Sequence, residues 1–148
     1  SMTSVENEYI HKSAIQELQV LYSIAIDSGD YDILDKVFTP DAVGIYGRPF
    51  NGIEEIKQAM FNGCDYFTSV QHLNGNHWAS IQGTNATAGC YLHVIQHLID
   101  TPGGDLHEMG GVYDDQLVLT DSGWRITERK IAIKWSKGNT LIRDSKPR

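Results

Sequence analysis

The sequence predicts an α+β domain in which a curved, mostly antiparallel sheet wraps around a long helix near the amino terminus. Apolar residues in the first part of the chain recur at the 3.6-residue spacing of helices, whereas after about residue 69 they recur at the two-residue spacing of strands. Short stretches rich in Gly, Asn, Asp and Pro separate the strand-like segments, as hairpin turns do. Helices followed by hairpin-linked strands are typical of α+β domains.

The longest helix is expected at residues 8–28, which contain no Pro or Gly and repeat apolar side chains at helical spacing. Val20 and Ile24 add a second apolar row beside the first, so we expect the carboxyl half of this helix to be covered on most sides. Gly29 is expected to end it, because glycine adopts the left-handed conformation found after many helices.

Shorter elements follow. Asp30 is expected to cap a short helix, which Thr39 and Pro40 stop. Next we expect a strand at residues 42–46, a turn at 48–52, a third helix at 53–61 and four strands at 69–81, 86–99, 108–119 and 124–135. Residues 138–148 are polar and carry Pro147, so we expect a single domain at residues 8–137 and a loose polar tail.

Composition excludes several classes of protein. The chain has 148 residues, 41% of them apolar, which suits one core and is short for two domains. It has 19 Asp and Glu against 12 Lys and Arg, a formal charge of −7, so nucleic acid is not an expected partner. No apolar run is long enough to span a membrane and no leader pattern is recognisable, so we expect a soluble, cytoplasmic protein.

No pattern indicates a metal or a cofactor. Cys64 and Cys90 lack the spacing of zinc ligands and are expected to be buried thiols. His93 and His97 would stand about 13 Å apart along a strand, too far to share one ion. The motifs of phosphate-binding loops, dinucleotide-binding folds, serine hydrolases and zinc proteases are absent from the sequence.

Asp27 is the first unusual residue. It follows Val20 by seven residues and Ile24 by three, so it continues an apolar row with a carboxylate at the last turn of the helix. Such a residue either points inward or caps local backbone at the end of the helix, and periodicity alone leaves both readings open.

The strand at residues 69–81 carries polar groups where a packed core would not place them. His72, Asn74, Asn76 and Trp78 are predicted to share one side. A row of His and Asn suits the wall of a polar pocket, but an exposed strand face is also polar.

The next strand has two contrasting faces. Cys90, Leu92, Val94 and Leu98 form one of them, and Tyr91, His93, Ile95 and His97 form the other. The second face could meet solvent, another subunit or a cavity. The remaining histidines, His11, His77 and His107, are expected at the surface.

Five segments, at residues 14–18, 26–31, 38–42, 52–56 and 123–126, resemble the SnoaL-like branch of the nuclear transport factor two-like superfamily. The likeness runs from about residue 14 to 135 and implies the cone-shaped fold of that superfamily. It does not by itself identify a reaction, because this scaffold carries many.

Within the branch, the pattern is most similar to scytalone dehydratase, hexachlorocyclohexane dehydrochlorinase and the bile-acid dehydratases. These enzymes have an Asp at the end of the first helix and a His on the first long strand, and here those positions are Asp27 and His72. The resemblance implies that His72 is a general base and that Asp27 orients it and stabilises its imidazolium. It also implies that Leu92 and Val94 face away from the cavity while the histidine face of their strand lines it.

The resemblance also implies substrate-binding roles for eight further residues. They are Tyr22, Tyr46, Tyr91, His93, His97, Met109, Tyr113 and Arg129, with His93 and His97 as competitors for one role. Ile26 and Ile95 stand where the similar enzymes have polar residues. We therefore do not expect this chain to share the substrate of any of them.

The resemblance therefore implies a cofactor-independent lyase of the dehydratase kind, acting on a small hydrophobic molecule of polycyclic, terpenoid or polyketide type. An isomerase or a polyketide-type cyclase would use the same base. A binding module without chemistry is the alternative outside enzymes. The resemblance also implies a homodimer or homotrimer formed through the open face of the sheet.

Overall fold

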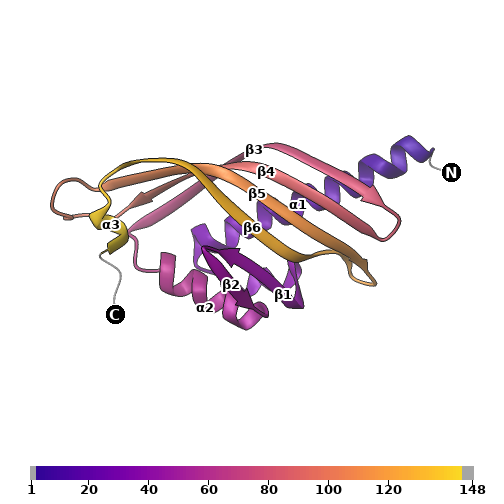
Figure 1. The fold of residues 1–148 in the computed structure, drawn as a ribbon, viewed down its shortest axis with the longest axis horizontal. Helices are drawn as coiled ribbons and strands as arrows, with labels where there is room; N and C mark the ends of the chain where they lie inside the picture. Colours follow the sequence, from indigo (N-terminus) through magenta and orange to yellow (C-terminus); the bar gives the residue numbers. More distant parts are fainter. Residues whose placement is uncertain (1–2, 145–148) are drawn as a thin grey trace.

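The computed structural model describes residues 3–144 and confirms the predicted α+β class (Figure 1). Six strands form one curved sheet in the order β2-β1-β6-β5-β4-β3, and all neighbours are antiparallel except β1 and β6. The elements are α1 (Ser4–Ser28), the 3₁₀ helix η1 (Tyr31–Lys36), β1 (Phe38–Tyr46), β2 (Arg48–Asn51), α2 (Ile53–Cys64), β3 (Ser69–Gln82), β4 (Asn85–His97), β5 (Leu106–Thr120), β6 (Gly123–Gly138) and α3 (Leu141–Asp144).

Helix α1 begins four residues earlier than expected, because the Thr3 hydroxyl caps it by accepting a hydrogen bond from the Glu6 N–H at 3.1 Å. It ends where expected, since Gly29 takes a left-handed conformation with φ of 74°. The sheet packs against one side of this helix, along the row that contains Ile15 and Tyr22.

The expectation that α1 is covered on most sides was wrong. Val20 and Ile24 are 40% and 45% exposed, because the side of the helix away from the sheet has no second layer over it. The apolar row that Asp27 continues is therefore the outer edge of the helix–sheet contact.

Two details after α1 also differ from expectation. Asp30 makes no side-chain cap at the start of η1, and Thr39 and Pro40 lie inside β1. Pro40 is tolerated there because the pairing of β1 with β6 shifts register between Phe38 and Val43. The expected turn at residues 48–52 is mostly the short edge strand β2.

Strand β3 contains a bulge that the alternating pattern did not reveal. Gly75 pairs with Tyr91 but the next pair is Trp78 with Gly89, and Asn76 has a φ of 49°. The bulge reverses the alternation, so Trp78 leaves the face of His72 and lies over Gly89 on the outer side, where glycine leaves room for the indole ring.

The carboxyl-terminal segment is ordered where we expected a loose tail. Ile142 of α3 is fully buried, and the Tyr66 hydroxyl donates toward the carbonyls of Ile142 and Arg143 at 3.0 and 3.1 Å. The Asn139 amide binds two carbonyls of the β4–β5 connection. Pro147 and the other residues at 145–148 lie outside the described residues. Within the described part of the chain, no helix is long and apolar enough to cross a membrane.

A charged cluster lies inside the core, where β5, β6 and α1 meet. Arg129 and Asp115 form a two-pronged ion pair at 2.7 and 2.9 Å with both side chains fully buried. Gln19 of α1 donates to the same carboxylate at 3.1 Å. Burial acts to lower the pKa of Arg129, but the Asp115 carboxylate outweighs burial and raises that pKa above its ordinary value.

We expect Asp115→Ala to lower the free energy of unfolding by about 3–5 kcal/mol, because it leaves the Arg129 charge buried without a partner. Urea denaturation followed by circular dichroism measures this change. Asp114→Ala is the matched control: its side chain lies on the exposed face of the same strand, and a change within about 0.5 kcal/mol is expected. Equal effects of the two substitutions would contradict the role given to the pair.

Candidate active site

A cavity of about 440 Å³ lies between the inner face of the sheet, α1, α2 and α3. Most of its wall is apolar, from residues such as Leu92, Val94 and Ile131. Its polar or titratable members are Tyr22, Tyr46, Cys64, His72, Gln96, Tyr113 and Arg143. This composition fits a small, largely apolar molecule that meets a few polar groups.

Asp27 and His72 form a close pair at the wall of the cavity. One carboxylate oxygen of Asp27 lies 2.6 Å from Nδ1 of His72, and the other accepts from the His72 backbone N–H at 2.9 Å. The His72 side chain is 6% exposed and that of Asp27 is 26% exposed. The expected contact between them is confirmed, and the reading in which Asp27 only caps its own helix is not what the structure shows.

The pair leaves one nitrogen of His72 available. With Nδ1 bonded to a carboxylate, Nδ1 carries the proton and Nε2 is the basic nitrogen. No residue in the range 3–144 bonds to Nε2, while the ring lines the cavity. A substrate C–H group placed there would meet an imidazole held by a carboxylate.

Two phenols, those of Tyr22 and Tyr46, also line the cavity. The Tyr22 hydroxyl donates to that of Tyr46 at 2.9 Å. Burial raises the pKa of Tyr46 to about 12, and burial together with Tyr46 raises that of Tyr22 well above its ordinary value. Because Tyr46 accepts from Tyr22, its own proton is free to bond an oxygen in the cavity.

Arg129 packs against the rings of Tyr22 and Tyr113 and does not itself line the cavity. Its guanidinium lies 4.3 Å from the ring centre of Tyr22 and 3.9 Å from that of Tyr113. The sequence prediction that Arg129 contacts substrate therefore needs correction. Met109 and Tyr113 do line the cavity, as expected.

Tyr91, His93 and His97 lie on the opposite face of the sheet, so their prediction as cavity residues was wrong. Tyr91 is 56% exposed, and His93 bonds Glu108 at 3.0 Å beside Trp135 on the outer side. The physical reason is that the more apolar face of β4, which carries Leu92 and Val94, packs toward the helices, so the other face of this strand turns outward. The homo-oligomer expected through this face stays a prediction.

Sequence reasoning missed most of the apolar wall, including Leu92 and Val94, which we expected to face away, and it also missed Cys64, Gln96 and Arg143. Gln96 could have been found, because it interrupts the otherwise apolar inner face of β4. It bonds His107, which is buried and not at the surface as expected. Burial lowers the pKa of His107, and the charge of Arg143 lowers it further.

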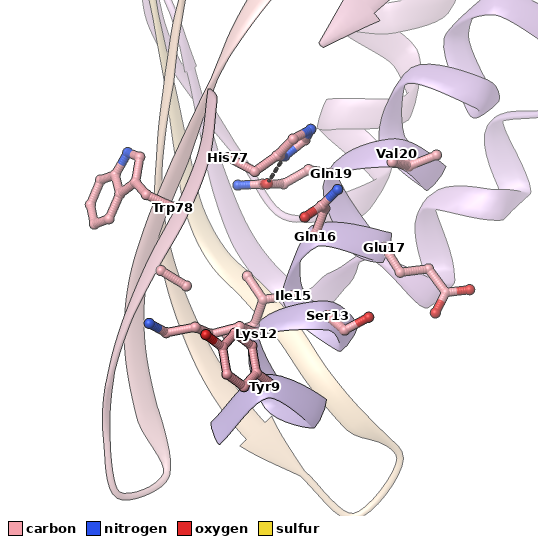
Figure 2. Close-up of a pocket in the computed structure, with 11 residues that line it drawn as sticks. Tyr9, Lys12, Ser13, Ile15, Gln16, Glu17, Gln19, Val20, His77 and Trp78 are labelled. Carbon is pink, nitrogen blue, oxygen red and sulfur yellow. Dashed lines mark hydrogen bonds between the residues drawn. The ribbon is translucent and has the colours of Figure 1, made fainter. Parts of the chain in front are cut away.

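A second hollow of about 710 Å³ lies between α1 and β3 (Figure 2). His77 and Gln19 point toward each other there, with Nδ1 of His77 2.6 Å from Gln19 Oε1, while Trp78 projects from the other side of β3. An amide holds His77, so an imidazolium would lack the counter-charge that Asp27 gives His72. We therefore place the chemistry in the smaller cavity.

A family model described as the SnoaL-like domain matches residues 8–130 of the chain. An uncharacterized protein of Mycobacterium tuberculosis is 36% identical over 138 residues, which cover 87% of this chain and 88% of the relative. The family match runs from α1 into the first half of β6, and the cavity residues Ile131, Ile133 and Arg143 lie after it.

Solved structures share the fold at low identity. A candidate scytalone dehydratase from Novosphingobium aromaticivorans has a TM-score of 0.81 at 19% identity, covering 90% of each chain. A hexachlorocyclohexane dehydrochlorinase has a TM-score of 0.80 at 17%, covering 90% of this chain and 92% of that one. A nuclear transport factor 2-like protein from Salmonella enterica has a TM-score of 0.78 at 18%, covering 90% and 97%. At such identities these likenesses show the fold alone.

We expect long-range ¹H–¹⁵N spectra of the imidazoles at pH 8 to show His72 in the tautomer with the proton on Nδ1, because the Asp27 carboxylate accepts from that nitrogen. Asp27→Ala removes the acceptor, and a mixture of tautomers should replace the single form. Asp30→Ala, three residues further along the chain, is the control and should leave the His72 signals unchanged. A dominant Nε2–H form in the unsubstituted protein would contradict the arrangement.

Proposed function

The chain belongs to the SnoaL-like domain family, and we propose that it is a cofactor-independent lyase of the dehydratase kind, with His72 as general base. The observation that carries the proposal is the Asp27–His72 pair, with its free Nε2 on a mostly apolar cavity. Among the fold neighbours, one is named a dehydrochlorinase and one a candidate scytalone dehydratase, and both names describe eliminations.

In the proposed step, Nε2 of His72 removes a proton from a substrate carbon next to a carbonyl. The C–H electron pair forms an enolate and then a carbon–carbon double bond as the adjacent C–O bond breaks. The departing hydroxide takes the proton back from the imidazolium and leaves as water, so the base returns to its starting form. Asp27 stabilises the imidazolium between these events, and such general acid–base assistance contributes roughly 10²–10⁴-fold in rate.

Tyr46 supplies the complementary hydrogen bond. A phenol with a pKa of about 12 stays protonated at neutral pH and can donate to the substrate carbonyl oxygen as negative charge develops there. The Tyr22 hydroxyl donates to Tyr46 and so stabilises negative charge on that oxygen. Tyr22 and Tyr46 thus act as one donor unit on the wall of the same cavity as the base.

Two alternatives use the same geometry. An isomerase would return the proton to another carbon of the enolate, and a cyclase would let the enolate attack a second carbonyl carbon. A binding module would do neither, although a carboxylate-held histidine at the wall of a cavity favours chemistry over simple binding. The substrate we propose is a small hydrophobic ring compound, and a panel of cyclic β-hydroxy ketones is the natural first screen.

The test is incubation with that panel in D₂O, followed by mass spectrometry. A lyase gives products lighter by one water, whereas an isomerase, or a cyclase on a compound with a second carbonyl, gives products of unchanged mass apart from incorporated deuterium. A binding module changes no compound and incorporates no deuterium. This last outcome across the panel, together with saturable binding, would refute the lyase proposal.

We expect His72→Asn to lower turnover of any compound found in this screen by at least about 10²-fold, because it removes the base. Asp27→Asn should lower turnover by a comparable factor, because the amide keeps the size of the side chain but loses the charge that stabilises imidazolium. His93→Asn is the matched control on the outer face and should retain nearly full activity. The measurement is initial rate, with circular dichroism to verify folding, and full activity of His72→Asn would remove it from the mechanism.

A further inference from the structure

We propose that Arg143 makes this cavity selective for ring compounds that carry a carboxylate, which the guanidinium binds at the end away from His72. The proposal deepens the proposed function and rests on it for the role of the cavity, since it names the class of molecule that enters. Its evidence is the charge of the cavity wall, the partners of Arg143 and the spacing between Arg143 and His72.

One end of the cavity carries a positive charge, although the chain as a whole is acidic. The whole protein has a formal charge of −7, and among the described residues the cavity lining has no Asp or Glu side chain, since Asp27 is bound to His72 without lining the cavity itself. Arg143 is the lining residue with a permanent positive charge. A concave, mostly apolar surface with one cation attracts an anion more strongly than the flat surface of the same protein would.

Arg143 has donors to spare. Its Nη1 lies 3.1 Å from the sulfur of Met109, which is a weak acceptor. None of the ion pairs formed within residues 3–144 includes Arg143. A planar guanidinium with free N–H groups is suited to two-pronged binding of a carboxylate.

The backbone that carries Arg143 is held in place. Tyr66 donates to the carbonyl of Arg143 at 3.1 Å, and the neighbouring Ile142 is fully buried. Asn139 fastens the start of the segment to the β4–β5 connection through bonds of 2.8 Å. The backbone of Arg143 is therefore held beside the cavity, and the residue, which is exposed, presents its guanidinium from there.

The sheet sets the spacing between base and cation. His72, Val94 and Met109 are direct partners across β3, β4 and β5, so His72 and Met109 are two strand spacings apart, about 10 Å. Arg143 contacts Met109 at the far end of that row. A fused two-ring acid has the length to contact both ends.

The test compares binding of 2-naphthoate with that of 2-naphthamide, which has the same shape without the charge. Isothermal titration calorimetry at pH 8 should give the unsubstituted protein a preference for the carboxylate of about tenfold or more, as charge-assisted hydrogen bonds imply. Arg143→Gln should abolish the preference, and Arg143→Lys should retain part of it. Arg125→Gln is the matched control, because among residues 3–144 the Arg125 guanidinium donates to backbone carbonyls near the β5–β6 turn and lies outside the cavity lining.

Several results would overturn the proposal. One is equal binding of the two compounds by the unsubstituted protein. Another is a carboxylate preference that survives Arg143→Gln, and a third is a loss of that preference in Arg125→Gln as large as in Arg143→Gln. Failure of both compounds to bind at millimolar concentration would overturn the inferred size. His72→Asn separates the two hypotheses: we expect it to keep the carboxylate preference while losing turnover, and a preference lost only in this variant would assign the anion to His72.

Discussion

The buried ion pair of Asp115 and Arg129 is the interaction on which the placement of the cavity depends. Its carboxylate accepts from Gln19 of α1, and its guanidinium packs against the ring of Tyr22 one turn further along the same helix. These contacts fix both the position of α1 along the sheet and its rotation about its own axis. Asp27 lies eight residues after Gln19, about 12 Å along the helix, and reaches β3 only with that rotation.

Much of the fold follows from local patterns, which is why the sequence predicts it. The long helix, its end at Gly29 and the four carboxyl-terminal strands depend on periodicity and on turn residues. The bulge after Gly75 does not, because only the pairing with β4 reveals it. The burial of Ile142 was equally hidden, since its contacts are with segments far away in the sequence.

The candidate site was predictable only in part, and the reason is physical. Asp27 and His72 each break a local pattern, so the sequence marks them, although it was the family likeness that joined them. For β4 we expected polar side chains to line the cavity, but packing against the helices favours the apolar face that carries Leu92 and Val94. Arg143 gave no signal, because its local sequence does not differ from that of any surface charge, and the residue is exposed in the structure although it also lines the cavity.

The proposed chemistry and the proposed anion site are compatible because the cavity separates its charges. Proton transfer to His72 creates an imidazolium that is already paired with Asp27, so this end of the cavity becomes neutral as a unit. The enolate that forms at the same time meets Tyr46, a donor that stays protonated. A carboxylate bound at Arg143, which contacts Met109 two strand spacings from His72, would hold the ring without repelling the enolate strongly, because the guanidinium neutralises it. Placing the cation beside His72 instead would stabilise the enolate but oppose protonation of the base, so the two-strand separation favours both steps.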